Sequence, residues 1–239
     1  MRPGFLKATS LAAAVLLALG AMAGKATEAE AAFALRVSDG TTTVTVPDGT
    51  GADQDGRVGA ITYISVGVFT GWTISVTTGM TDPLLSPPLP HLSLDSIQMS
   101  SIGGGSLTVE LSETDISTGA SIAPFNTSIS GVTAGTVEFQ SFVNPDNTLF
   151  STTGTQVADL GPLSGVMGFS AQESGWAPVS SPYGVTLRWI ITHGGAGSTD
   201  GKAEFQIPEP ESLALFGFGL LGLGSLLMRR RRGAARLAA

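Results

Sequence analysis

The sequence predicts an all-β protein whose body is an antiparallel β-sandwich or a jelly roll. Three observations lead to this prediction. Between residues 33 and 207, apolar and polar residues alternate with a period of two, which is typical of half-buried strands. Clusters of Gly, Pro, Asn and Asp separate the alternating runs. Charged residues make up only 13% of the 239 residues, and no window of the body has helical periodicity.

The strands follow one another along the body as short runs. Asp39-Gly40 lies between the runs 34–37 and 43–46, which is a strong hairpin signal. Thr70-Gly71 separates 61–66 from 72–77 in the same way. Further strands are expected at 92–100, 106–112, 126–131, 136–143, 156–160, 164–172, 183–192 and 200–207. Because no fixed period repeats, a solenoid or a propeller is disfavoured.

Composition excludes several classes of protein. The chain has no Cys, which rules out disulfides, thiolate zinc sites and iron–sulfur clusters, and its two His make a His-rich metal centre unexpected. We therefore expect no cofactor and no metal. The body, 33–207, has four basic residues against fifteen acidic ones, a net charge of −11. Such a surface repels phosphate backbones, so nucleic acid is excluded as a partner.

The first 32 residues have the pattern of a secretory signal peptide and a short leader. Arg2 and Lys7 precede an apolar run from Leu11 to Leu19, which is too short to span a bilayer. Small residues follow, with cleavage sites after Ala23 and after Ala31. We expect the secretion machinery to be a partner. The alternative, an amphipathic helix, is disfavoured because Leu and Ala lie on every face of the run.

The last segment, 208–239, combines three features in order. Pro208-Glu209-Pro210 precedes an apolar run from Leu213 to Met228, and Arg229, Arg230, Arg231 and Arg232 follow it. A helix of this length is about 24 Å long, close to the hydrocarbon thickness of a bilayer. We expect a single transmembrane helix with the arginines as its cytoplasmic anchor and the body outside. The GxGxxG pattern inside the run has no βαβ unit around it, so it is not a dinucleotide site.

The ordered triple of Pro-Glu-Pro, apolar helix and arginine cluster resembles the PEP-CTERM sorting signal. The resemblance implies an exosortase that recognises Pro208, Glu209 and Pro210, removes the tail and delivers the body to the cell surface or medium. It also implies a Gram-negative bacterium that exports polysaccharide. A generic single-pass anchor is the alternative. The body resembles a group of uncharacterised PEP-CTERM proteins, in the segments 71–79, 147–150, 191–193 and 197–199, and no activity comes with that likeness.

Acidic residues form two groups that suggest chemistry. Asp48, Asp53 and Asp55 resemble part of a calcium loop, but the first and last ligands of an EF-hand are missing, so a solvated acidic turn is favoured. Glu110, Glu113 and Asp115 form the other group. Glu113 and Asp115 are expected on one face of a strand, where a glycosidase could use paired carboxylates. No aromatic residue surrounds them in sequence, which favours an exposed strand end.

The remaining candidates are a histidine and three tryptophans. His193 precedes a glycine-rich turn, and no GxSxG motif supplies a nucleophile for it, so we expect a strand-end histidine bonded to the backbone. Packing in the core or at its rim is the simplest expectation for Trp72, Trp176 and Trp189. Trp176 is expected on a loop and is the best candidate for stacking against a sugar.

Taken together, the sequence favours an exported protein that is not an enzyme and that serves as a structural component of the cell surface or extracellular matrix, associated with exopolysaccharide. It would pass the inner membrane, be anchored there transiently and then reach the surface. The alternative is an extracellular carbohydrate-binding module or glycan hydrolase.

Overall fold

The computed structural model describes residues 32–81, 84–85, 91–117 and 121–207. These residues contain ten strands and no helix. The strands are β1 (Phe33–Ser38), β2 (Thr43–Pro47), β3 (Ala60–Val66), β4 (Trp72–Met80), β5 (His91–Ser101), β6 (Gly105–Ile116), β7 (Ile122–Asn144), β8 (Thr155–Pro178), β9 (Tyr183–His193) and β10 (Gly197–Gln206). The predicted segments 1–32 and 208–239 lie almost wholly outside the described residues.

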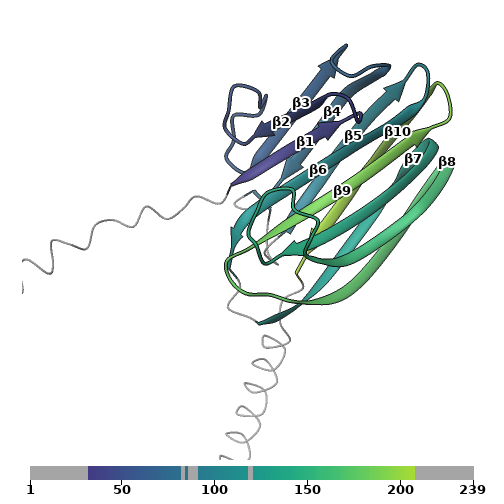
Figure 1. The fold of residues 1–239 in the computed structure, drawn as a ribbon. Coiled ribbons are helices and arrows are strands. Elements are labelled where there is room, and N and C mark those ends of the chain that lie inside the picture. Colours follow the sequence, from purple (N-terminus) through teal and green to yellow (C-terminus); the bar gives the residue numbers. More distant parts are fainter. Residues whose placement is uncertain (1–31, 82–83, 86–90, 118–120, 208–239) are drawn as a thin grey trace, which may run out of the picture. The chain divides into compact units, whose positions relative to one another are not determined.

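All strand pairs are antiparallel and belong to one sheet, in the order β2-β1-β6-β9-β7-β10-β5-β4-β3, with β8 paired to β7 (Figure 1). The prediction of an all-β, antiparallel body is thus confirmed. Both predicted hairpins form, β1 with β2 and β3 with β4. Asp39 closes the first one, because its carboxylate accepts hydrogen bonds from the backbone N–H groups of Thr41 and Thr42.

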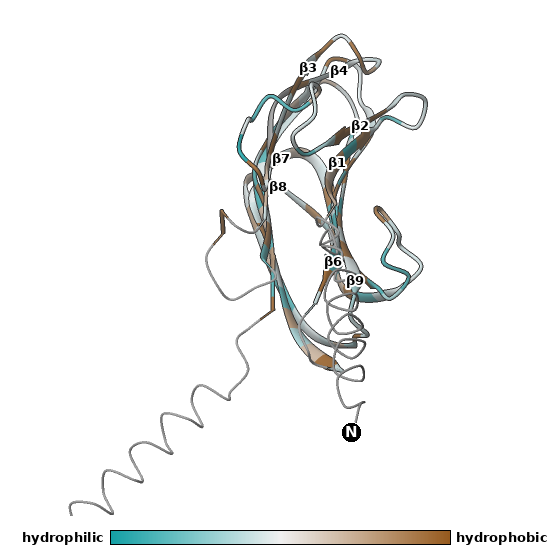
Figure 2. Cartoon of the chain, turned by 90° about the vertical axis from the view of Figure 1, so that its left-hand side faces the viewer, coloured by the Kyte–Doolittle hydropathy of each residue, from teal (hydrophilic) through white to brown (hydrophobic). Residues whose placement is uncertain are grey.

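The single sheet folds over into two facing layers (Figure 2). The first layer contains β2, β1, β6 and β9, and the second contains β10, β5, β4 and β3. The long strand β7 belongs to both, since residues 136–144 pair with β9 and residues 126–133 pair with β10. The strand β8 follows β7 along nearly its whole length. At one end of the sandwich, β7 and β8 bend from one layer to the other within their own length. We call this end the crest; it comprises residues 101–105, 131–136, 161–169 and 193–197.

Two expected strand breaks are therefore wrong. The runs 126–131 and 136–143 are parts of the single strand β7, and the runs 156–160 and 164–172 are parts of β8. Gly and Pro between the runs predict turns. In the structure they mark bends and register shifts through which the two strands stay paired.

Apolar side chains of both layers fill the space between them. Trp189 on β9 is fully buried, with Phe139 and Phe169 edge-on to its indole at centroid distances of 6.1 and 6.5 Å. Its ring packs against Gly201 on β10, where a Cβ atom would lie 2.8 Å from Trp189 Cη2. Phe125 and Phe205 stack at 5.2 Å. A core of this kind can stabilise the body without disulfides.

The crest requires a residue without a side chain at position 135. A Cβ atom on Gly135 would lie 2.0 Å from the backbone oxygen of Thr192, a contact that no rotamer change can relieve. We expect Gly135→Ala to lower the free energy of unfolding by about 3 kcal/mol. Chemical denaturation monitored by circular dichroism measures it.

Gly103 provides the matched control on the same crest, because a Cβ atom there meets nothing within 4 Å. We expect Gly103→Ala to leave stability unchanged or to raise it by about 0.5 kcal/mol. Equal stability of the two variants would contradict the close approach at Gly135.

Candidate functional site

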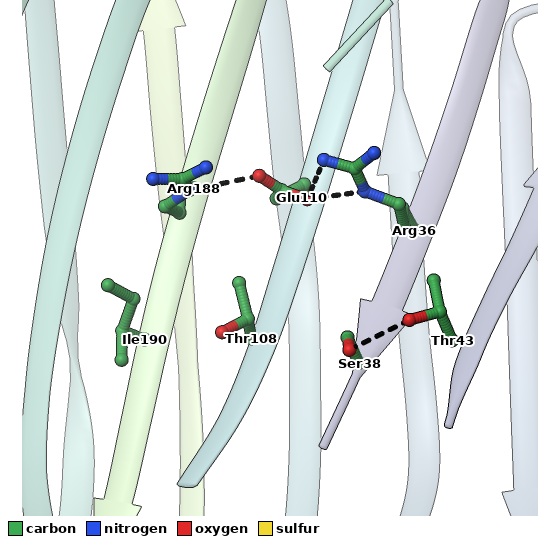
Figure 3. A pocket seen from close by; sticks show the side chains of 7 residues that line it. All are labelled: Arg36, Ser38, Thr43, Thr108, Glu110, Arg188 and Ile190. Atoms are coloured by element: carbon green, nitrogen blue, oxygen red, sulfur yellow. Dashed lines mark hydrogen bonds and ion pairs between the residues drawn. The ribbon is translucent and has the colours of Figure 1, made fainter. Parts of the chain in front are cut away.

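The candidate binding site is a pocket of about 320 Å³ on the outer face of the first layer. Four neighbouring strands contribute to it. Arg36, Glu110 and Arg188 lie side by side in one row across β1, β6 and β9, as the strand register requires. The next row toward the crest contains Ser38, Thr108 and Ile190, with Thr43 of β2 beside Ser38 (Figure 3).

Glu110 is held between the two arginines. Its Oε2 accepts a hydrogen bond of 2.6 Å from Arg36 Nε, and its Oε1 accepts one of 2.9 Å from Arg188 Nε. Although it points away from the core, Glu110 is only 4% exposed. A buried carboxylate needs such compensation, because desolvating a charge is costly without a partner. One carboxylate cannot neutralise two guanidinium groups, so the row carries a net charge of +1.

Aromatic rings support both arginines. Arg36 Cζ lies 4.3 Å from the ring centroid of Phe150, and Arg188 Cζ lies 5.7 Å from that of Phe142. These are cation–π distances. The arginine side chains are 31% and 27% exposed, so their heads are partly covered and yet reachable from the pocket. The guanidinium groups are thereby held in place before any ligand arrives.

The loop that carries Phe150 is tied to the end of β6. Asn147 and Asp115 exchange two hydrogen bonds of 2.8 Å, and the backbone N–H of Phe150 donates to Ser112 Oγ at 3.0 Å. Asp115, Asn147 and Phe150 have positive φ values, of 61°, 51° and 59°. That conformation is unfavourable for a bulky residue such as Phe. The tethers hold it there, and the ring consequently lies on Arg36.

Glu113 and Asp115 do not form the paired carboxylates of a glycosidase. Glu113 is buried rather than exposed, and its Oε2 accepts a 2.7 Å hydrogen bond from Thr81 Oγ1. Asp115 is held by Asn147. A register shift in β6 between Glu113 and Ile116 breaks the alternation that the prediction assumed. The expected exposed strand end is therefore wrong for Glu113 and for Glu110, both of which are buried.

His193 lies inside the crest and bonds to side chains, not to the backbone as predicted. It is 3% exposed, and its Nδ1 and Nε2 lie 2.8 Å from Ser101 Oγ and Thr199 Oγ1. Ser101 donates to the backbone oxygen of Gly195, so it accepts from His193 Nδ1–H. Thr199 then donates to Nε2 and accepts in turn from Thr133, 2.7 Å away. In this tautomer Nδ1 carries a proton and donates it to Ser101.

The acidic loop after β2 uses its carboxylates within the chain. Asp53 Oδ1 accepts from the backbone N–H groups of Asp55 and Thr62, and Asp48 Oδ2 accepts from that of Gly59. Asp55 forms an ion pair with Arg57 at 2.7 Å. Among the described residues, no group of three or more His, Asp or Glu side chains could hold a metal ion.

The tryptophans divide as expected, with one correction. Trp72 and Trp189 are 4% and 0% exposed, and the ring of Trp72 lies 4.9 Å from that of His193. Trp176 is 71% exposed, but it lies on strand β8 and not on a loop. On the same face of the second layer, Gln172 and Ser174 donate to Asn126 Oδ1 at 3.0 and 3.1 Å. The flanking Gly and Pro residues suggested a loop, whereas pairing with β7 keeps the segment extended.

Arg36, Arg188 and Phe150 were not predicted as site residues. Arg36 and Arg188 are half of the basic residues in the body, which is the signal that could have found them. Glu110 was predicted without these partners, since β1, β6 and β9 are not consecutive in the chain.

The tail of the chain matches a known family model, described as the PEP-CTERM protein-sorting motif, over residues 206–232. The match includes the proline–glutamate–proline triplet and all four consecutive arginines. Proteins with this motif are exported and sorted by an exosortase. The chain accordingly carries a PEP-CTERM sorting motif, and the match concerns its tail only. No helix capable of crossing a bilayer occurs in the described part of the chain.

Curated proteins show no match to this chain. Among solved structures, the CBM22-1 xylan-binding domain of Paenibacillus barcinonensis Xyn10C is 8% identical, covers 59% of this chain and 87% of its own, and has a TM-score of 0.28. Broad Bean Stain Virus (9% identity, 74% and 80%, TM-score 0.28) and the Gx strain of infectious bursal disease virus (13%, 75% and 53%, 0.32) also match. At these scores the likenesses carry no argument.

Burial lowers the pKa of His193 below its ordinary value. The imidazole therefore binds a proton more readily in the unfolded chain than in the native state. The contribution of neutral His193 to the free energy of unfolding is complete above a pH of about 6.5, and it is lost as the pH falls toward the lowered pKa. We expect the melting temperature of the wild type to decrease over this window, and that of His193→Gln to decrease less.

His91→Gln is the control, because His91 is the only other histidine in the chain. It shows whether the effect of His193→Gln is specific to His193. NMR titration of the His193 ring gives a second readout that does not depend on the variant folding. Identical slopes in all three proteins, or a ring midpoint above about 6.5, would contradict the assignment.

Proposed function

We propose that this protein is exported, is processed by an exosortase at Pro208–Pro210, and then serves as a non-enzymatic component of the cell surface or extracellular matrix. The observation that carries the proposal is the sorting motif at residues 206–232. The proposal assigns 1–32 to a signal peptide, 33–207 to one β-sandwich domain of jelly-roll type, and 208–239 to a transient membrane anchor.

Several features of the body support a role without catalysis. Glu110, Glu113 and Asp115 are each engaged by different partners rather than converging. The buried Ser101 is aligned as an acceptor toward His193, so it is not activated as a nucleophile. The acidic surface is in keeping with solubility outside the cell.

Replacing Pro208, Glu209 and Pro210 together with alanine tests the sorting proposal. We expect the variant to accumulate in the inner membrane at its uncleaved mass, because the exosortase no longer recognises it. Immunoblots of membrane and medium fractions from the native cell, with mass spectrometry of the termini, measure this.

The matched control replaces Glu211 and Ser212, the next two residues, with alanine. It should be processed and released like the wild type. Release of the triple variant at normal mass would refute sorting through this motif.

Carbohydrate binding is the second candidate function, and exposure of Trp176 favours it. An exposed indole can stack on a sugar ring, and the amide groups of Gln172 and Asn126 beside it on the same face can bond to hydroxyls. The proposed ligand is an exopolysaccharide of the matrix into which the protein is released.

The fluorescence of Trp176 reports directly on carbohydrate binding, because the other two tryptophans are buried. Its fluorescence should be red-shifted in the free protein and should move to shorter wavelength when a neutral polysaccharide binds. Trp176→Phe should abolish the change, whereas Trp72→Phe should keep it. A glycan array and a fluorescence titration that are both blank would dismiss the candidate.

A further inference from the structure

The pocket over Arg36, Glu110 and Arg188 has the features of a binding site for an anion. The body has fifteen acidic and four basic residues, and two of the four basic residues lie in this single row. The other two, Arg57 and Lys202, lie outside the pocket in pairs with Asp55 and Glu204. The pocket is thus a local cationic spot on an anionic surface, which selects for a small anionic group.

Arg36 and Arg188 have guanidinium N–H donors that do not bond to Glu110. A guanidinium group carries five N–H donors. Within the described part of the chain, Arg188 uses only Nε on Glu110, and Arg36 uses Nε and Nη2. Both arginines line the pocket, on either side of the shared carboxylate (Figure 3). The unused Nη donors match the two oxygens of a carboxylate, which guanidinium groups bind in a forked geometry.

The second row of the pocket adds hydroxyl groups. Ser38, Thr43 and Thr108 line it, with Ile190 as the apolar part of the wall. Ser38 and Thr43 bond to each other at 2.9 Å. The two rows are two residues apart along each strand, about 7 Å. A single pyranose ring that bears a carboxylate can bridge this distance, with its carboxylate on the arginines and its hydroxyls on the second row.

The site is also pre-ordered. Glu110 holds both arginines, and Phe150 supports Arg36 from the side of its tethered loop. Binding therefore costs little side-chain entropy, which is how a shallow pocket gains affinity. Its volume of about 320 Å³ is at the small end of ligand sites. That size suits one or two sugar units.

We propose that this pocket binds a carboxylate-bearing sugar residue, a uronate, of an acidic polysaccharide. The proposal does not depend on the sorting motif or on Trp176, which lies on the other layer. Phe150 and Arg36 orient the site. Arg188 makes the ionic contact with the uronate, because fewer of its N–H donors already bond to Glu110. Added salt screens the attraction to the arginines and also the repulsion between the acidic surface and the rest of an acidic polymer, so its two effects on affinity oppose each other.

The test uses the full chain in detergent, titrated with galacturonate and glucuronate oligomers by calorimetry and by NMR shift mapping. Neutral glucose oligomers and succinate are the comparison ligands. We expect the uronates to bind, the neutral sugar to cause no shifts in the pocket, and succinate to bind more weakly because it lacks hydroxyls. Shifts should map to Ser38, Thr108, Arg188 and Ile190.

Arg188→Gln should weaken uronate binding at least about tenfold, the loss of one charge-assisted contact. Lys202→Gln changes the net charge equally but lies outside the pocket, so it should bind as the wild type does. Thr108→Val, which keeps the β-branched shape, should weaken binding by a smaller factor and covers the case in which Arg188→Gln does not fold.

Four results would overturn the proposal. The first is no binding by any uronate, and the second is succinate binding as tightly as the uronates, which would indicate a general carboxylate site. The third is shifts that map to Trp176 instead of the pocket. The last is unchanged affinity in both the Arg188→Gln and Thr108→Val variants. None of them bears on processing at Pro208–Pro210, whose failure is read separately from the mass of the mature protein.

Discussion

The crest is the constraint on which the rest of the structure depends. There the chain passes from one layer to the other while its strands stay paired, so the two layers are halves of one sheet. The turn is tight enough to need glycine at 135, and it encloses polar groups that would otherwise lack partners. The chain of bonds from Thr133 through Thr199 and His193 to Ser101 satisfies them inside the apolar core.

The few basic residues of the body are all paired with acidic ones. With only four basic residues in the body, every one of them is found in an ion pair, and two share a single buried carboxylate. Glu113 is buried and accepts a hydrogen bond from Thr81, whereas Asp39, Asp53 and Asp146 lie in turns. This arrangement leaves one shallow cationic pocket on an anionic body, and an exposed tryptophan on the other layer. The two faces therefore differ in chemistry.

Sequence patterns predicted the strands well where side chains alternate and turns carry Asp-Gly or Thr-Gly. They failed at β7 and β8, since the same Gly and Pro residues that end a short strand also let a long one bend. Trp176 was misplaced on a loop for this reason. Glu113 was expected to be exposed, but it lies on the same face of β6 as the buried Val109 and Leu111, and its partner Thr81 is distant in the chain. His193 ends a strand as expected, but its partners are side chains of β5 and β10 and not the backbone.

The sequence by itself determined the alternating strands, the acidic body without Cys and the sorting tail, because each depends on residues close together in the chain. Only the tertiary structure decided the pocket. Glu110 is 74 residues from Arg36 and 78 from Arg188, and the three meet because β6 lies between β1 and β9. Strand order is set by how the long ribbons fold over the crest and bury a shared core, and that packing involves the whole chain at once.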